Sequence, residues 1–329
     1  MIRFGVVGTN TITDKFISQT SQNPDFLLNS VCSRSSETAM QFAKKYGLDP
    51  ENTFTDLREM AASGAIDAVY IATPNAFHAE QSILFLENKI PVLCEKPITS
   101  NTAELEAVIT AAKQNNVLFM EAMVTPHLPA FECIKQNISK IGTIRRIFLN
   151  YCQYSSRYDR FKSGELPNAF NPVLSNGSLM DIGIYCISAM IRLAGVPKKV
   201  YASATVLSSG ADGSGTLVCG YDGFDAVIMH SKVSDSKVYS EIQGENGSIL
   251  IDSINVPAKI ILAPRGGIEE DVTPVQIFPP MYYETTEFIN LLKLCQTESA
   301  VNSFETSLRV MAVLDEARRQ CNIVFSADK

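Results

Sequence analysis

The chain has 329 residues, of which 46% are hydrophobic and 19% are charged, and this length suits two domains that each bury a core. A formal net charge of −7 without a basic stripe argues against nucleic acid or an anionic membrane surface as a partner. The eight cysteines lack the short paired spacings of zinc or redox sites, so we expect reduced thiols and no metal.

The N-terminal segment predicts a strand, a turn and a helix. The run Ile2 to Gly8 is typical of a buried strand that opens onto a turn, and a helical pattern follows over 12–18. Dinucleotide-binding folds place a pyrophosphate at such a helix N-terminus. Gly8 occupies the first position of the Gly-x-Gly-x-x-Gly fingerprint, but Asn10 and Thr13 stand at the other two. Asparagine tolerates a left-handed backbone and the threonine hydroxyl could meet a phosphate, so a nucleotide loop and an ordinary turn both remain open.

Strands and helices then alternate along the chain. Strands are expected at 26–32, 68–72, 91–95 and 117–121, and helices at 36–46, 76–88 and 102–115. This alternation predicts a parallel sheet covered on both faces, with ligands at the carboxyl ends of the strands. The polar residues that follow those ends are Ser33, Arg34 and Ser35, then Thr73, Pro74, Asn75 and His78, then Glu95 and Lys96.

The residues after the second strand favour NADP over NAD. An NAD site usually carries an acidic residue there for the ribose hydroxyls, whereas this chain has Ser33, Arg34 and Ser35. Two hydroxyls and a guanidinium suit a 2′-phosphate better. Arg34 could instead lie over the adenine or in solvent, so NAD stays possible.

Lys96 directly follows the expected apolar strand 92–95 and precedes Pro97. Proline biases the preceding residue toward an extended backbone, so the strand aims this side chain in a fixed direction. A solvated lysine at a strand end is the alternative.

A second candidate pair lies in the segment 176–193, whose pattern predicts a helix ended by Gly195 and Pro197. Asp181 and Tyr185 are four residues apart, which places a carboxylate and a phenol on one helical face. A packed tyrosine beside a solvated aspartate would give the same pattern. Together with Lys96 and a nucleotide loop, the pair indicates an acid–base couple.

From residue 144 onward the pattern changes to strands with hairpin signals. The dipeptides Asp222-Gly223 and Asn246-Gly247 are turn sequences between alternating apolar runs. The sequence therefore predicts an α/β chain: a Rossmann domain with a doubly wound parallel sheet over 1–122, then an α+β domain with a large open, mostly antiparallel sheet over 123–329.

Four segments together carry a family resemblance. They are Gly8 with Ile12, Ala-Thr-Pro-Asn-Ala-Phe-His at 72–78, Glu-Lys-Pro at 95–97, and Met-Asp-Ile-Gly-Ile-Tyr at 180–185. On these residues the chain resembles the Gfo/Idh/MocA oxidoreductases, and within them the branch of the dimeric dihydrodiol dehydrogenases and glucose-fructose oxidoreductase. That branch has tyrosine where much of the family has histidine four residues after the aspartate.

The resemblance implies an NAD(P)-dependent oxidoreductase that interconverts an alcohol and a carbonyl on a sugar, polyol or dihydrodiol-like small molecule. Lys96 and Tyr185 would flank the nicotinamide, with Tyr185 giving or taking the proton. Asp181 would orient a substrate hydroxyl or Lys96, and Glu95 would contact the nicotinamide ribose. The expected cofactor-binding residues are Gly8, Thr9, Asn10, Thr11, Ile12, Ser33, Arg34, Ser35, Thr73, Pro74, Asn75, His78, Glu95 and Lys96.

The resemblance also implies an assembly and a compartment. The open sheet would pair with that of a second subunit, giving a homodimer or a higher homo-oligomer. A first strand that begins at Ile2 leaves no room for a signal peptide, and no apolar run looks long enough to span a bilayer, so we expect a cytoplasmic protein.

Departures from the branch leave the substrate open. The segment 121–129 reads Glu-Ala-Met-Val-Thr-Pro-His-Leu-Pro and lacks the aromatic residue and the arginine that the branch often has there. His127 could replace the lost polar contact or be structural. Two other functions remain: a nucleotide-binding sensor without catalysis, which the presence of Lys96 and Tyr185 disfavours, and an enzyme that retains its cofactor tightly.

Overall fold

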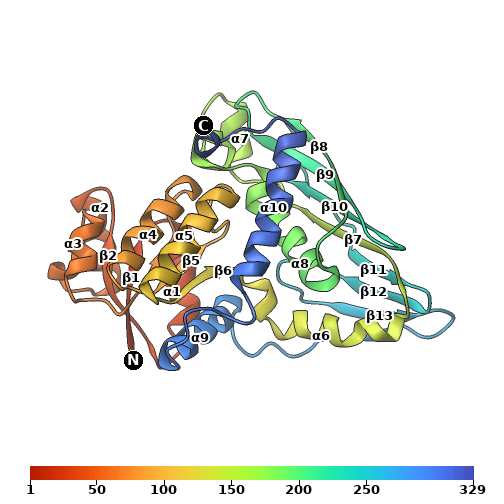
Figure 1. The fold of residues 1–329 in the computed structure, drawn as a ribbon, viewed down its shortest axis with the longest axis horizontal. Coiled ribbons are helices and arrows are strands. Elements are labelled where there is room, and N and C mark those ends of the chain that lie inside the picture. The colour runs from red at the N-terminus through yellow and green to blue at the C-terminus, as the bar shows by residue number, and fades with distance from the viewer. The chain divides into compact units, whose positions relative to one another are not determined.

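The computed structural model describes residues 1–329, which form two compact units (Figure 1). The first unit contains Met1–Met123 and Phe278–Phe304, and the second contains Val124–Ile277 and Glu305–Lys329. The sequence predicted an uninterrupted second domain from residue 123 to the end. The structure differs, because the segment 278–304 packs with the first unit.

The first unit is built on a six-stranded parallel sheet with the strand order β3-β2-β1-β4-β5-β6. Its strands are β1 (Ile2–Val7), β2 (Phe26–Cys32), β3 (Thr53–Phe54), β4 (Ala68–Ile71), β5 (Val92–Glu95) and β6 (Phe119–Ala122). This is the doubly wound order, which confirms the predicted Rossmann sheet. The order reverses between β1 and β4, and such sheets bind ligands outside the carboxyl ends of the strands at that point.

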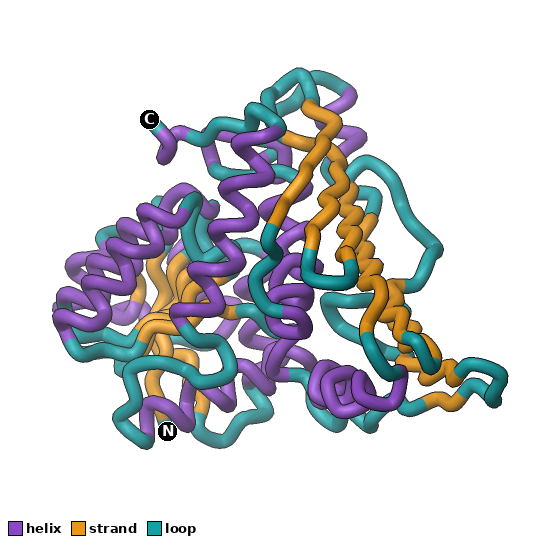
Figure 2. The backbone as a smooth tube through the Cα atoms, turned by 45° about the vertical axis from the view of Figure 1, so that its right-hand side comes forward, coloured by secondary structure: helices purple, strands orange, loops and turns teal.

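Helices pack on this sheet (Figure 2). They are α1 (Thr11–Thr20), α2 (Ser36–Tyr46), α3 (Leu57–Ala62), α4 (His78–Glu87), α5 (Thr102–Asn115) and α9 (Pro280–Lys293). On one face, the Phe16 ring of α1 stacks on the Tyr70 ring of β4 with 3.7 Å between their centroids. The Phe288 ring of α9 lies 6.0 Å from that of Phe4 in β1. Helix α9 therefore completes the core of the first unit, although it lies far along the sequence.

The second unit contains an eight-stranded sheet with the order β14-β13-β12-β11-β7-β10-β9-β8. Its strands are β7 (Ile144–Cys152), β8 (Lys199–Val206), β9 (Asp212–Gly220), β10 (Asp225–Ser231), β11 (Ser240–Gly244), β12 (Gly247–Ile251), β13 (Ile260–Pro264) and β14 (Glu270–Asp271). Only the central pair β7 and β10 is parallel, so the mostly antiparallel sheet is confirmed. The helices of this unit are α6 (Pro129–Asn137), α7 (Tyr158–Lys162), α8 (Ile184–Ala194) and α10 (Phe304–Gln320).

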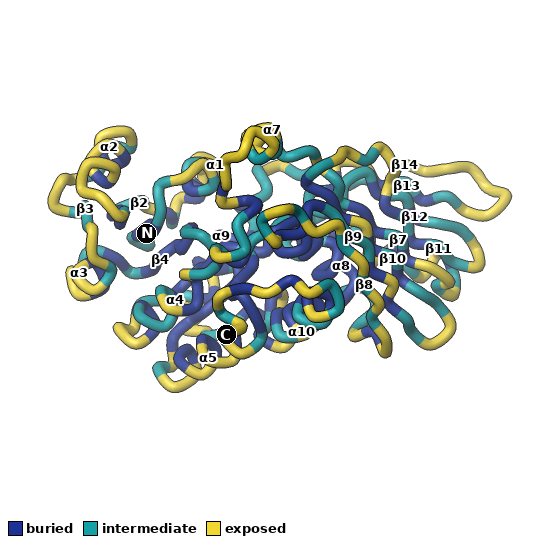
Figure 3. The backbone as a smooth tube through the Cα atoms, turned by 90° about the horizontal axis from the view of Figure 1, so that it is seen from above, coloured by how far each residue is buried: buried dark blue, intermediate teal, exposed yellow.

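The strands of this second sheet carry buried, intermediate and exposed residues (Figure 3), and its two faces differ in burial. Successive side chains of a strand point to opposite faces, and α8 packs on the face where Leu217 and Ile228 are buried. On the other face Tyr201, Val218 and Met229 are 60%, 39% and 37% exposed. The expected dimer through this sheet stays a prediction.

One apolar stretch of the second unit corrects an expectation. The helical residues Pro172–Ala194 are long and apolar enough, by length and composition alone, to cross a membrane. However, 72% of the 18-residue window that meets this criterion is buried inside the protein. A buried core helix passes the same test of length and composition, so the stretch is weak evidence for a membrane span.

We predict that Phe288→Ala lowers the free energy of unfolding by about 3–5 kcal/mol, because it leaves a cavity in a fully buried aromatic core. Urea unfolding followed by circular dichroism measures this. The matched control on the same segment is Leu294→Ala, which removes a side chain that is 68% exposed and should cost less than about 0.5 kcal/mol. Equal effects of the two changes would contradict the role of α9 in the core.

The second unit also contains a half-buried histidine, His127. The Nε2 atom of His127 is buried and has no hydrogen-bond partner. Burial, followed by the nearby positive charge of Arg192, lowers the pKa of His127 to about 3. Below its unfolded pKa of about 6.5 the imidazole takes up a proton in the unfolded chain but not in the folded protein. The free energy of unfolding is therefore highest above that pH and decreases as the pH falls.

We therefore expect His127→Gln to reduce the acid sensitivity of the protein. Between about pH 7.5 and pH 5, the wild type should lose about 2 kcal/mol more unfolding free energy than the variant. Urea unfolding at both pH values gives the comparison, and the higher pH serves as the reference because the imidazole is neutral in both states there. An identical pH dependence would show that His127 is not held neutral.

Candidate active site

The turn between β1 and α1 depends on a glycine and two polar side chains. Gly8 has φ +96°, and a Cβ atom there would lie 2.8 Å from the carbonyl oxygen of Ala72 at the end of β4, so only glycine fits. The Asn10 side chain accepts the amide of Ile12 at 2.9 Å and donates to the Ala72 carbonyl at 2.6 Å. The Thr13 hydroxyl donates to the Gly8 carbonyl at 2.9 Å. Polar side chains thus build the turn where the fingerprint has glycines.

Two reasons offered for Asn10 and Thr13 from the sequence were wrong. Asn10 has φ −90° and ψ 179°, so it is extended rather than left-handed. Thr13 is fully buried and its hydroxyl donates to the Gly8 carbonyl, so the hydroxyl is not available to bind a phosphate. Asn10 also accepts the amide of Thr13 at 3.4 Å. The amides left at the start of α1 are therefore those of residues 9–11, and a helix N-terminus of this kind fits an anion such as a pyrophosphate.

The residues after β2 are exposed. Arg34 lies on the surface. Ser35 is the N-cap of α2: its hydroxyl accepts the amide of Thr38 at 3.2 Å and lies 2.7 Å from the Thr38 hydroxyl. The segment contains no acidic side chain, and Ser33 is half-buried beside Arg34. A guanidinium next to a helix N-terminus fits a phosphate group.

His78 joins two loops instead of facing a ligand. Its side chain is fully buried, with Nε2 2.9 Å from the carbonyl oxygen of Thr73 and Nδ1 2.8 Å from that of Pro97. Burial lowers the pKa of His78, and a neutral imidazole carries one N–H, so one of these contacts is the hydrogen bond. Thr73 itself donates its hydroxyl to Gln81 at 2.7 Å. We had expected His78 to touch the cofactor, but its burial leaves no surface for that contact.

The Glu-Lys-Pro corner follows β5 and contains a buried carboxylate. Glu95 is 7% exposed, accepts the hydroxyl of Tyr70, and accepts the amide of Lys96 at 3.2 Å. Burial raises the pKa of Glu95, and the charge of Lys96 opposes that rise. Pro97 is buried and Lys96 is half-buried. The corner therefore holds the ammonium group of Lys96 next to a carboxyl group that is already anchored by a phenol.

A second buried acid lies in the first unit and escaped the sequence analysis. Glu284 of α9 is 1% exposed and its Oε2 atom has no hydrogen-bond partner. Burial, together with the charge of Glu95, raises its pKa well above the usual range. This shift favours the protonated form of the acid. In the sequence, Glu284 is marked only by its position in an amphipathic helical pattern. That pattern does not show which strands the helix packs against.

In the second unit, Asp181 lies on a π-helical turn, Leu179–Gly183, that leads directly into α8. The sequence predicted an ordinary helix there, and the wider turn is a feature found frequently at functional sites. Asp181 and Tyr185 are half-buried, and the three residues between them are buried. The Tyr185 ring packs edge-on against Tyr151 of β7, with centroids 5.7 Å apart. The carboxylate of Asp181 pairs with Lys232, which follows β10.

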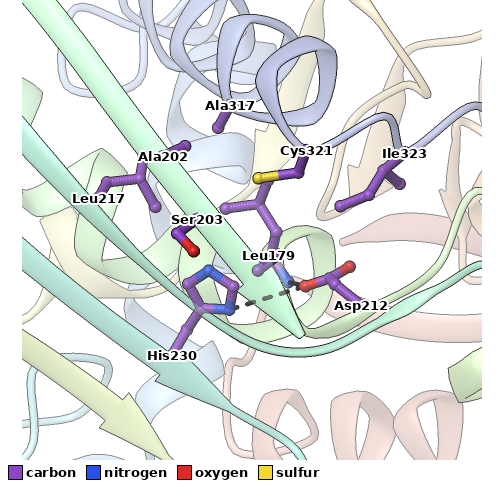
Figure 4. Close-up of a pocket in the computed structure, with 10 residues that line it drawn as sticks. Leu179, Ala202, Ser203, Asp212, Leu217, His230, Ala317, Cys321 and Ile323 are labelled. Atoms are coloured by element: carbon purple, nitrogen blue, oxygen red, sulfur yellow. Dashed lines mark hydrogen bonds and ion pairs between the residues drawn. The ribbon is translucent and has the colours of Figure 1, made fainter. Parts of the chain in front are cut away.

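Below the π turn lies a small buried polar cluster (Figure 4). Asp212 accepts the amide of Leu179 at 2.6 Å, and His230 Nδ1 lies 2.9 Å from the Ser178 hydroxyl and 3.8 Å from Asp212 Oδ2. Burial raises the pKa of Asp212 to about 6 and lowers that of His230 to about 3. The cavity between them is about 10 Å³, room for one water molecule and far too small for a sugar.

The structure brings the predicted residues together in two sets. In the first unit, the residues after β2, β1, β4 and β5 lie at the carboxyl edge of four neighbouring strands. In the second unit, Asp181 and Tyr185 share the start of one helical segment. The joint action of Lys96 with Tyr185 stays a prediction. No group of three His, Cys, Asp or Glu side chains could hold a metal ion.

Known proteins resemble the chain over its whole length. The family model described as an oxidoreductase family with an NAD-binding Rossmann fold matches residues 2–123, and the Gfo/Idh/MocA C-terminal domain matches residues 134–250. The chain is 51% identical to scyllo-inositol 2-dehydrogenase (NADP(+)) IolU of Bacillus subtilis, covering 100% of both chains. It is 46% identical to the uncharacterized oxidoreductase YgjR of Escherichia coli, covering 100% of this chain and 99% of YgjR.

Solved structures show the same fold at lower identity. KijD10, a 3-ketoreductase from Actinomadura kijaniata in complex with TDP-benzene and NADP, matches with a TM-score of 0.84 at 19% identity, over 98% of this chain and 99% of that one. An aldose-aldose oxidoreductase from Caulobacter crescentus matches with a TM-score of 0.86 at 17% identity, over 98% and 97%. The identity to the curated relatives and the two domain matches settle the question: the chain belongs to the Gfo/Idh/MocA family of oxidoreductases.

Proposed function

We propose that this protein is an NADP-dependent dehydrogenase of a cyclic polyol, with an inositol as the first substrate to test. One observation carries the proposal: 51% identity over the full length of an NADP-dependent scyllo-inositol 2-dehydrogenase. The family makes the chain an NAD(P)-dependent oxidoreductase that acts on CH–OH groups, as the motifs predicted. The choice of a cyclic polyol as substrate goes beyond what membership of the family establishes.

The first unit supplies the features that a dinucleotide requires. The amides of residues 9–11 at the start of α1 fit the pyrophosphate, and Arg34 and Ser33 fit the 2′-phosphate of NADP. When bound, this cofactor accepts or supplies the hydride. We expect His78 to act indirectly, because it contacts both the loop that carries Thr73 and the carbonyl of Pro97, the residue directly after Lys96.

Tyr185 is the proposed acid and base. A phenol has a pKa of about 10 and is a poor proton acceptor at neutral pH, but a nearby ammonium stabilises the phenolate. During oxidation the substrate hydroxyl gives its proton to Tyr185 while the carbon gives up hydride, and reduction runs the same transfers backwards. Lys96 stabilises the negative charge that develops on the substrate oxygen. Asp181 accepts a hydrogen bond from a neighbouring substrate hydroxyl and so orients the ring.

The alternative of a catalytically inactive sensor has no observation in its favour, since Lys96, Asp181 and Tyr185 are all present. A homodimer in the cytoplasm remains the expected assembly and location.

We predict that the purified protein oxidises scyllo-inositol with NADP, and that Tyr185→Phe reduces kcat at least about 100-fold without changing the affinity for NADPH. Absorbance of the reduced nicotinamide measures turnover, and fluorescence titration measures binding. The matched control is Tyr201→Phe, which changes an exposed phenol of the same unit.

Full activity of Tyr185→Phe would overturn the assigned role. NADPH binding without turnover on any inositol, sugar or related diol would favour the sensor. Cofactor that stays bound through purification, with turnover only when two sugars are supplied, would indicate an enzyme that recycles its hydride internally.

Arg34→Ala tests the cofactor preference separately. Loss of one charge-assisted contact to the 2′-phosphate should raise the Kd for NADPH about 10- to 100-fold, while the Kd for NADH changes less than about twofold. Arg265→Ala, which removes an exposed guanidinium of the second unit, is the control. Equal losses for both nucleotides would remove the reason for preferring NADP.

A further inference from the structure

A buried lysine directly follows β10. The side chain of Lys232 is 5% exposed, and its ammonium pairs with the carboxylate of Asp181, which is 35% exposed. The same ammonium donates to the carbonyl of Ala169 at 3.3 Å and lies 5.4 Å from the ring centroid of Phe170. Neither the family motifs nor the sequence pattern singled out this residue. Lys232 is thus held on several sides, whereas Asp181 retains an exposed edge.

Fold stability does not account for this ion pair. Removing an ammonium group from water is costly, and a buried pair seldom stabilises a protein more than well-packed apolar side chains would. The pair does, however, fix a charge and a direction. A carboxylate that is bound by an immobile ammonium is held in one orientation.

The π turn that carries Asp181 is anchored to the same strand edge. Ser178 contacts His230, two residues before Lys232 in the chain, and the Leu179 amide donates to Asp212. This anchoring needs glycine. A Cβ at Gly183 would lie 3.1 Å from the His230 ring, and one at Gly177 would lie 2.1 Å from Asp212 Oδ1. The backbone around Asp181 therefore has little freedom. Lys232 fixes what is left to vary, which is the orientation of the Asp181 side chain.

We propose that Lys232 is a positioning residue of the reaction, whose ammonium keeps Asp181 ionised and orients its carboxylate toward the substrate. This inference rests on the proposed function and deepens it, because it assigns the lysine that controls the substrate-orienting aspartate. Lys232 acts through Asp181 and does not itself touch the reacting atoms.

The other titratable groups near Asp181 do not replace this charge. On the elements packed against the π turn, the groups nearest to Asp181 in the chain or at the strand ends next to Lys232 are His230, Asp212, Tyr151, Cys152, Tyr185 and Cys186. None of these six is cationic at neutral pH, since burial holds His230 neutral. The other charged groups on these elements are Arg145, Arg146 and Asp225, at the opposite ends of β7 and β10, and Arg192, eleven residues after Asp181. Removal of Lys232 should therefore raise the pH at which Asp181 becomes ionised.

The test compares Lys232→Met, Lys232→Arg and the exposed control Lys198→Met, whose lysine pairs with Asp222 on the surface. We expect Lys232→Met to lower kcat about 10- to 100-fold with unchanged NADPH affinity, and to move the acidic limb of the kcat/KM profile upward by about 1–2 pH units. Lys232→Arg should restore most of the rate and the original limb. Lys198→Met should match the wild type.

A double-mutant cycle shows whether Lys232 acts through Asp181. In an Asp181→Asn background, Lys232→Met should change kcat by less than about twofold, because the group that it positions is gone. Undiminished loss in that background would overturn the proposal, as would a wild-type pH profile in Lys232→Met. If Lys232→Met does not fold, Lys232→Gln keeps a donor for the Ala169 carbonyl and takes its place.

A carbon NMR titration of the Asp181 carboxyl group, assigned by its loss in Asp181→Asn, separates this inference from the proposed function. If the wild type turns over no polyol, the proposed function fails, yet a raised Asp181 pKa in Lys232→Met would still support the pairing. If the wild type is active and the Asp181 titration is the same in both proteins, only the inference about Lys232 fails.

Discussion

Close approaches at glycine positions hold the functional turns of both units against their sheets. Gly8 brings the turn after β1 against the Ala72 carbonyl of β4. In the second unit, Gly183 and Gly177 let the π turn settle on His230 and Asp212. A Cβ at Gly8 or Gly177 would collide with its neighbour and displace the turn, and one at Gly183 would be tight against the His230 ring. The positions of Asn10 and Asp181 follow from these approaches.

Burial shifts the pKa values of several ionisable groups toward the neutral form, while charged groups remain at the candidate site. Burial raises the pKa values of Glu284 and Asp212 and lowers that of His230. By contrast, Lys96 in one unit and Asp181 in the other are half-buried, and Asp181 is ion-paired with Lys232. In surroundings of low polarity, a single fixed charge interacts strongly with a charge that develops nearby during reaction.

Local patterns were sufficient to predict the parallel sheet, the antiparallel sheet and the residues that follow the strand ends. Lys96 and Tyr185 could be found because their motifs are contiguous in sequence. The role of His78 could not, because its two partners are backbone carbonyls on separate loops. Lys232 and Glu284 could not be found for the same reason, because each interacts with a residue about 50 or more positions away in the sequence. An amphipathic pattern indicates that a side chain is buried but does not identify its partner. The π turn was missed because a one-residue widening leaves the apolar periodicity nearly intact.

The return of the chain to its first unit has a consequence for biosynthesis. Residues 278–304 supply α9, and its Phe288 covers Phe4 on a face that the first 123 residues cannot close alone. A ribosome releases the chain from its N-terminus, and domains made of one contiguous segment can fold as soon as they emerge. This nucleotide-binding unit must instead wait, with an apolar face uncovered, until most of the second unit has been translated. The parallel sheet β1–β6 is complete within the first 122 residues, so the part of this unit that stays uncovered is the face that α9 closes later.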